Sequence, residues 1–214
     1  MDKKDVKNYC YELLSQKLKP AGFTGNKKDQ TFMRANDRGF DWVLFSIVEY
    51  AALKQYDILF SVGMRLNKVQ ELVNQMFSFH QEEQKNKNLT CIVDIGSFTG
   101  NHDLKFETFS TADIETAVDR FWEIYIGQAE KYIQNCYDLA FLNRIFPEHR
   151  EKANRWLTAF QCYVTVPTVA WLADGEGFAD FRQAYTKYLV ECHIPEDKLD
   201  ELNSYLDRIT QTSL

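Results

Sequence analysis

Two neighbouring stretches decide the fold: FDWVLFSIVEY at residues 40–50 and QYDILFSVGMRL at residues 55–66. In the second stretch, apolar side chains alternate with polar or small ones, which is the period of a β-strand. In the first, apolar side chains occupy both even-numbered and odd-numbered positions, so both faces of that strand are apolar. We therefore expect two long strands of a sheet, the first of them covered at least in part on both faces.

The sequence before these stretches predicts a helix and a hairpin. Apolar residues recur at spacings of three and four over residues 6–18, and Pro20 and Gly22 end the helical pattern. Residues 31–35 have the pattern of a strand, and turn residues at 36–39 lead into the first long strand. This segment is expected to form a β-hairpin.

Between the second long strand and residue 110 the pattern alternates again. Residues 68–79 have helical spacing, and the polar run at 81–88 is expected to be an exposed loop. Residues 90–97 and 104–109 predict two further strands. We interpret the connection between them, residues 96–103, as a hairpin loop.

Beyond residue 110 the pattern is helical to the end of the chain. A long helix at about 112–136 is expected to pack on the sheet. Pro147 is interpreted as a first-turn residue that opens another helix, which Pro167 should kink or break. A helix over residues 178–189 and a last one opened by Pro195 complete the pattern.

These patterns predict an α+β fold. An antiparallel sheet of about five strands with an N-terminal helix is followed by an all-helical C-terminal half. The expected organisation is an α+β sheet domain at residues 1–110 and a helical region packed on it at residues 111–214.

Composition and charge exclude some classes of function. The 214 residues are 45% apolar and carry a net charge of −6. This charge provides no positive field for phosphates, so nucleic acid is not an expected partner. Residues 110–214 carry ten Lys plus Arg against seventeen Asp plus Glu. An acidic half of this kind predicts a basic protein or peptide as partner.

Cysteine and histidine usage points away from metal chemistry and from an oxidising compartment. Five cysteines occur without a Cys-x-x-Cys pair, and the four histidines are isolated from one another. Structural metal sites need several such ligands in close spacing. We expect reduced cysteines, no metal, no cofactor, no membrane segment and a cytoplasmic location.

Charged residues on the predicted strands are candidates for a ligand site. A charge at a covered sheet position must be paired or hydrogen-bonded. Several carboxylates on one face could serve acid–base chemistry. The candidates are Asp41, Asp57, Arg65 and Asp94.

The long helix and the aromatic residues of the C-terminal half suggest two binding surfaces. Glu123, Glu130 and Asp138 fall on the polar side of the long helix and are candidates to contact a basic partner. Aromatic residues at helical spacing are expected in the core, but a groove lined by some of them could hold a peptide. They are Trp122, Tyr125, Tyr132, Trp156, Phe160, Trp171, Phe178 and Phe181.

No convergent set of reactive groups is visible, so the sequence favours a non-catalytic protein-interaction module. Two alternatives are a small-molecule-binding or hydrolytic site on the sheet, and a helical peptide-binding scaffold built by the C-terminal half. A cavity that contains two or more of the sheet carboxylates would favour the first alternative. A groove between C-terminal helices would favour the second.

The segment LLSQKLKPAGFTGNKKDQTFMRA at residues 13–35 carries a family resemblance. A helix that ends in Leu-x-Pro-x-Gly-Phe, a Lys-rich connection and a Thr-Phe-x-Arg strand together resemble a bacterial domain-of-unknown-function family numbered 4304. The resemblance covers residues 6–110 and implies an N-terminal α+β domain and a bacterial origin. Because that family has no established activity, it assigns no role to any residue here.

Overall fold

The computed structural model describes residues 1–76, 87–148 and 159–211. The chain forms two compact units, each made of two separate segments: Met1–Arg65 with Ile92–Asn135, and Leu66–Cys91 with Cys136–Leu214. The predicted α+β class is confirmed: an N-terminal helix and an antiparallel sheet are followed by helices. The polar run at 81–88 lies mostly outside the described residues. Residues 149–158, where the sequence predicts a helix beyond Pro147, also lie outside them.

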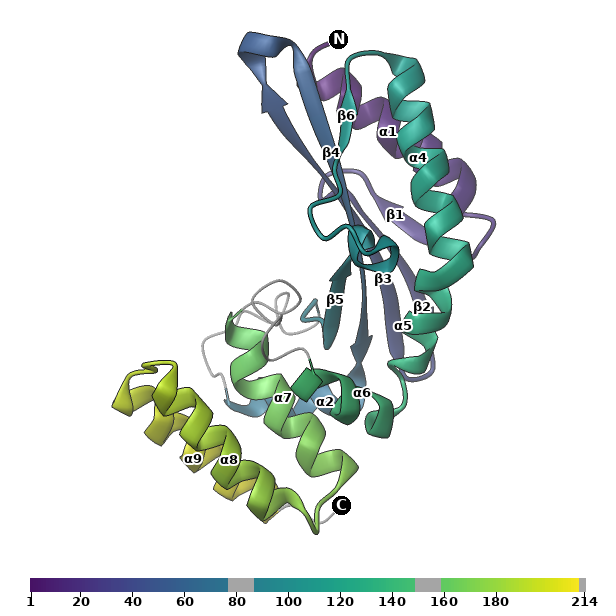
Figure 1. The fold of residues 1–214 in the computed structure, drawn as a ribbon. Helices are drawn as coiled ribbons and strands as arrows, with labels where there is room; N and C mark the ends of the chain where they lie inside the picture. The colour runs from purple at the N-terminus through teal and green to yellow at the C-terminus, as the bar shows by residue number, and fades with distance from the viewer. Residues whose placement is uncertain (77–86, 149–158, 212–214) are drawn as a thin grey trace. The chain divides into compact units, whose positions relative to one another are not determined.

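The sheet is built around the two long strands (Figure 1). Its main order is β1-β2-β3-β4-β5, and β6 also pairs with β4. The strands are β1 (Thr24–Asn26), β2 (Thr31–Asn36), β3 (Gly39–Tyr50), β4 (Gln55–Leu66), β5 (Cys91–Asp94) and β6 (Phe106–Thr108). The predicted hairpin is β2–β3, with Phe32 opposite Val43 and Arg34 opposite Asp41. The short edge strand β1 was not predicted from the sequence.

The expected hairpin between the last two strands is wrong. β5 and β6 each pair with β4, and the segment between them begins with a 3-10 helix, η2 (Ile95–Thr99). A Cβ atom on Gly96 would lie 2.2 Å from the carbonyl oxygen of Asn101. Only glycine permits this close return of the chain. The small residues that suggested a hairpin loop therefore serve a compact turn.

Helix α1 (Lys3–Leu18) ends where the sequence indicates and begins three residues before the predicted start. Asp2 and Asp5 form a capping box at its start. At its end Gly22 has φ +88°, and the N–H of Phe23 donates to the carbonyl oxygen of Leu18. Phe23, directly before β1, is buried.

The predicted long helix exists, but its middle turn is wide. Helix α4 (Thr111–Ile124) continues through a π-helical turn, η3 (Tyr125–Ala129), into α5 (Glu130–Asn135). The buried positions Phe121, Tyr125, Ala129 and Ile133 are separated by four residues three times in succession. In a regular α-helix each step of four drifts by about 40° around the axis. The wide turn absorbs this drift and keeps the side chains on one face.

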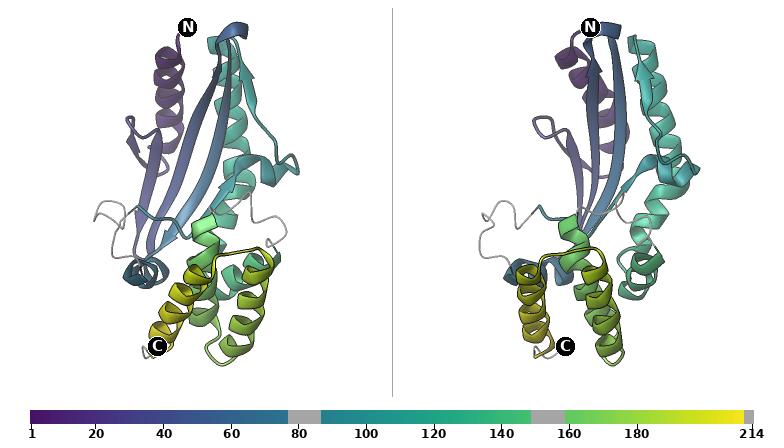
Figure 2. Two further views of the ribbon diagram at one scale, coloured as in Figure 1. Left: turned by 90° about the vertical axis from the view of Figure 1, so that its left-hand side faces the viewer. Right: turned by 60° about the vertical axis from the view of Figure 1, so that its left-hand side comes forward.

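Helices α1 and α4 cover one face of the sheet (Figures 1 and 2). Tyr11 of α1 stacks on Phe32 of β2, and Phe121 of α4 stacks on Phe60 of β4 with ring centroids 4.6 Å apart. On β3 the odd-numbered positions 41–47 face these helices and are buried. The even-numbered positions run from buried at Phe40 to 43% exposed at Val48. The second face of β3 is therefore covered in part, as expected.

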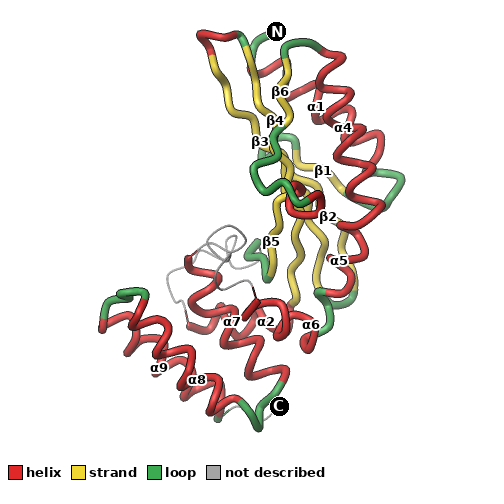
Figure 3. Tube along the Cα trace, in the orientation of Figure 1, coloured by secondary structure: helices red, strands yellow, loops and turns green. Residues whose placement is uncertain are grey.

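The second unit is mainly helical (Figure 3). Its helices are α2 (Asn67–Met76), α6 (Leu139–Glu148), α7 (Ala159–Ala173), α8 (Phe178–Glu191) and α9 (Glu196–Thr210). Helix α7 packs against all four of the others. The helix over 178–189 and the helix that follows Pro195 are confirmed as α8 and α9.

The prediction that Pro147 opens a helix is wrong, and so is a break at Pro167, whereas a kink at Pro167 stays a prediction. Pro147 lies in the last turn of α6 and not at the start of a helix, and α7 continues through Pro167. A proline inside a helix removes one hydrogen bond and costs about 3 kcal/mol. Around Pro167 the side chains of Val164, Val166 and Val169 are buried. Packing of α7 on several neighbours offsets the local cost.

We predict that Phe121→Ala destabilises the first unit by about 3–5 kcal/mol, because it removes a fully buried ring that stacks on two others. Urea unfolding followed by circular dichroism measures the change. Phe109→Ala is the matched control, since Phe109 is 62% exposed and its loss should cost less than about 0.5 kcal/mol. Equal losses in the two variants would contradict this account of the core.

Candidate functional site

The four candidate residues on the sheet do not converge. Asp41 lies on the face that α1 and α4 cover, whereas the odd-numbered positions of β4, Asp57 and Arg65 among them, point to the other face. Along β4, Asp57 and Arg65 are eight residues apart, which is about 26 Å in an extended strand. The predicted ligand site on one sheet face is therefore not formed by these four residues.

Each candidate on the outer face has its own local role. Asp57 is buried and accepts hydrogen bonds from Lys105 Nζ at 2.7 Å and from Gln55 Nε2 at 2.9 Å. Burial raises the pKa of Asp57, but the hydrogen bonds from Lys105 and Gln55 outweigh it and hold the pKa below its ordinary value. Asp94 is exposed and accepts a hydrogen bond from Ser61. Arg65 is buried.

Asp41 belongs to an ionic cluster centred on Arg34, a residue that the sequence analysis did not single out. Arg34 Nε and Nη2 donate to one carboxylate oxygen of Asp41, at 2.9 and 2.8 Å. Its Nη1 donates to Glu130 at 2.8 Å. Gln134 Nε2, one turn beyond Glu130, donates to the same Asp41 oxygen at 3.1 Å. The cluster therefore joins the β2–β3 hairpin to α5.

The position of Arg34 follows from register and from an aromatic platform. Arg34 and Asp41 are direct cross-strand partners. The guanidinium lies over the ring of Phe23, with Cζ 4.8 Å from its centroid. Burial lowers the pKa of Arg34, but its hydrogen bonds to Asp41 and Glu130 raise it above its ordinary value. These hydrogen bonds favour the charged form of Arg34, which is already the form of arginine in proteins.

The π-helical turn contributes Tyr125 to the same region. Tyr125 is 1% exposed, and its hydroxyl group has no hydrogen-bond partner among the described residues. Burial raises the pKa of Tyr125, and the charge of Arg34 opposes this shift only in part. The phenol stays neutral. The cluster holds two engaged carboxylates and one engaged cation, so its chemistry is that of a clamp between segments.

The three carboxylates expected to contact a basic partner occupy different settings. Glu123 is exposed and pairs with Arg120 one turn away on α4. Glu130 pairs with Arg34 in the cluster, so it is not a free surface carboxylate. Asp138 caps α6 by accepting hydrogen bonds from the N–H groups of Ala140 and Phe141. Of the three, only Glu123 is an exposed carboxylate on the long helix without a role in the cluster or in a helix cap.

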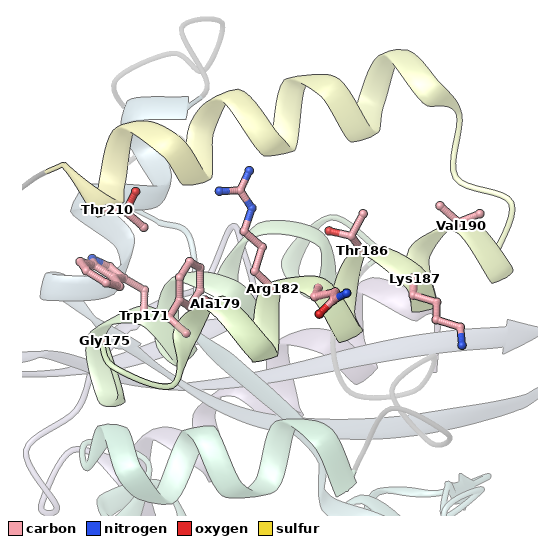
Figure 4. A pocket seen from close by; sticks show the side chains of 10 residues that line it. Trp171, Gly175, Ala179, Arg182, Thr186, Lys187, Val190 and Thr210 are labelled. Atoms are coloured by element: carbon pink, nitrogen blue, oxygen red, sulfur yellow. The ribbon is translucent and has the colours of Figure 1, made fainter.

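The second unit contains a groove of about 700 Å³ along α8. We call it the α8 groove (Figure 4). Its lining residues come from the end of α7, the following turn, α8 and the end of α9: Trp171, Gly175, Phe178, Ala179, Arg182, Gln183, Thr186, Lys187, Val190 and Thr210. None of the four sheet candidates lines it.

The lining residues of α8 recur at helical spacing. From Ala179 to Val190 they follow steps of three and four, so they form one continuous face of the helix. Trp171 and Phe178 also line the groove, and their ring centroids lie 5.4 Å apart. Both aromatic residues are among those that the sequence predicts for a peptide groove. The α8 face could not be predicted, because Ala, Gln and Thr at these positions resemble an ordinary solvent-exposed surface.

A smaller cavity of about 370 Å³ lies in the first unit. Met1, Asp5, Asn8, Tyr9, Glu12 and Thr111 line it. Its acidic groups are already engaged. Asp5 takes part in the capping box of α1, and Glu12 pairs with Lys27 at 3.1 Å. Tyr9 donates a hydrogen bond to Glu115 of α4. This cavity therefore presents polar groups that already have partners, and it is about half the volume of the groove in the second unit.

The described residues lack two features that would point to particular classes of function. They contain no group of three or more His, Cys, Asp or Glu that could hold a metal ion. None of the helices they form has the length and apolar character needed to cross a membrane.

Comparisons with known proteins assign no relative to this chain. No protein-family model, no curated protein and no solved structure matches it. The resemblance of residues 6–110 to the family numbered 4304 stays a prediction.

Replacement of Asp41 by Asn should destabilise the first unit by about 3 kcal/mol, because it removes one charge of a mostly buried ion cluster and leaves Arg34 with Glu130 alone. Urea unfolding measures the loss. Glu123→Gln is the control, since its pair with Arg120 is exposed and is worth at most about 0.5 kcal/mol. Ordinary surface substitutions change the free energy of unfolding only slightly. A loss below about 1 kcal/mol for Asp41→Asn would be of that size and would show that the cluster does not clamp the hairpin.

The lowered pKa of Asp57 predicts a pH effect. A carboxylate whose pKa is lower in the folded state stabilises the protein above its unfolded-state pKa, and this contribution is lost as pH falls through the folded-state pKa. The difference in free energy of unfolding between wild type and Asp57→Asn should therefore shrink below about pH 5. Urea unfolding at a series of pH values tests this. A difference that stays constant down to about pH 3 would contradict it.

Proposed function

We propose that this protein is a non-catalytic interaction module that binds a helical segment of a partner protein in the α8 groove. The observation that carries the proposal is a groove lined along one uninterrupted helix face, with the contacting rings of Trp171 and Phe178 in its lining. This geometry supports the helical peptide-binding alternative that the sequence left open.

The dimensions of the groove suit a short helix. Ala179 and Val190 are eleven residues apart, which corresponds to about 17 Å along the axis of α8. A helix of three turns has the same length and presents side chains at i, i+3 or i+4, and i+7. Small side chains such as Ala179 and Thr186 allow the backbone of a second helix to approach closely.

A ligand-binding or hydrolytic site on the sheet has less support than a peptide site in the α8 groove. Its candidate residues lie on both faces, and Asp41 and Asp57 are each engaged with a cation. Neither described cavity is lined by any of them. A basic partner on the long helix also remains a prediction, with Glu123 as the carboxylate best placed to contact it.

Two substitutions on α8 test the proposal. Ala179 and Ala184 are both exposed, but only Ala179 lines the groove. Peptides of about 16 residues, long enough for four helical turns, are selected from a random display library on the wild-type protein. Ala179→Arg should weaken binding of the selected peptides about tenfold or more, because the new side chain fills the groove.

Ala184→Arg adds the same side chain outside the groove and should leave peptide affinity unchanged. Circular dichroism and thermal unfolding confirm that both variants fold. If the library yields no peptide whose affinity depends on Ala179, the α8 groove is not a binding site.

A further inference from the structure

We infer that the segment bound in the α8 groove is an amphipathic helix that is apolar on its groove side and carries Asp or Glu beside Lys187. This inference rests on the proposed function and adds the chemical class of the partner. The acidic segment is opposite in sign to the partner that the net charge suggests.

The groove differs in charge from the rest of the chain. The chain carries a net charge of −6, yet none of the ten lining residues is Asp or Glu. The two charged lining residues, Arg182 and Lys187, are both cations. A basic segment would therefore meet charges of its own sign in the groove.

The two cations are not equivalent. Arg182 Nη1 donates to Asp207 of α9 at 2.6 Å, and its Nη2 donates to the side chain of Asn203 at 3.1 Å. This pairing neutralises Arg182 and fixes it between α8 and α9. Figure 4 shows the Arg182 side chain directed toward α9 and the Lys187 side chain directed away from it.

Lys187 is the charge available to a partner. It is exposed, and it forms no ion pair within the parts of the chain that the structure describes. It lies between the polar Gln183 and the apolar Val190, which is 54% exposed. A carboxylate here gains an ion pair, while apolar side chains of the same segment contact Val190, Ala179 and Trp171. Charge complementarity thus selects an acidic helix.

The library selection above also tests the sign of the partner charge. Groove-dependent peptides, defined by their loss of binding to Ala179→Arg, should contain more Asp plus Glu than Lys plus Arg. Lys187→Glu should weaken their binding about 3- to 10-fold, since it replaces one exposed attraction by a repulsion. Lys187→Gln should have an intermediate effect, and higher salt should shrink the difference.

Lys131→Glu makes the same change of charge at an exposed position of α5 outside the groove and should leave affinity unchanged. Groove-dependent peptides without an acidic excess, or with equal affinity for Lys187→Glu, would overturn the acidic partner but leave the proposed function standing. Absence of any groove-dependent peptide removes both. Self-association of the wild-type protein that Ala179→Arg abolishes would identify a second copy as the occupant and overturn the inference.

Discussion

The guanidinium of Arg34 joins three parts of the first unit that are far apart in sequence. It binds Asp41 across the β2–β3 pair, Glu130 at the start of α5, and the face of Phe23 just after α1. Charges in a partly buried place are tolerated only when each finds a partner. Because Arg34 must pair with both Asp41 and Glu130, the position of α5 against the β2–β3 hairpin is fixed. The other contacts of the long helix are consistent with this position: Phe121 stacks on Phe60, and Tyr125 lies beside Arg34.

The π-helical turn is part of the same constraint. Without it, the faces of α4 and α5 would drift apart around the helix axis, and Phe121 and Ile133 could not both face the sheet side. A wide turn is less favourable than a regular one, and such turns are rare. Here the burial of several apolar side chains and the ionic cluster outweigh that cost. The turn therefore has a packing role in the first unit.

The second unit is organised around a single central helix. Helix α7 is apolar on all sides, and its neighbours α2, α6, α8 and α9 pack around it. Helix α8 buries Tyr185 and Leu189 in the core, while the face from Ala179 to Val190 lines the α8 groove; Phe178, at the start of the helix, is buried and also lines the groove. A helix that needs only one face for its core can leave another for binding. This separation makes a stable interaction surface possible without a strained site.

The sequence by itself determined the class of fold, the β2–β3 hairpin, the long strands, the long helix and the last two helices, because these depend on local periodicity and turn residues. It also indicated Trp171 and Phe178 as residues of a peptide groove. It could not indicate that Asp41 and Glu130 share Arg34, since strand register and helix rotation decide which distant charges meet. The sequence likewise did not predict η2 or a helix that continues through Pro167. At both places side-chain burial outweighs the local conformational preference of the residues. The α8 face of the groove was decided by tertiary structure, because exposed Ala, Gln, Thr and Lys residues line a groove only where residues of α7 and α9 lie beside them.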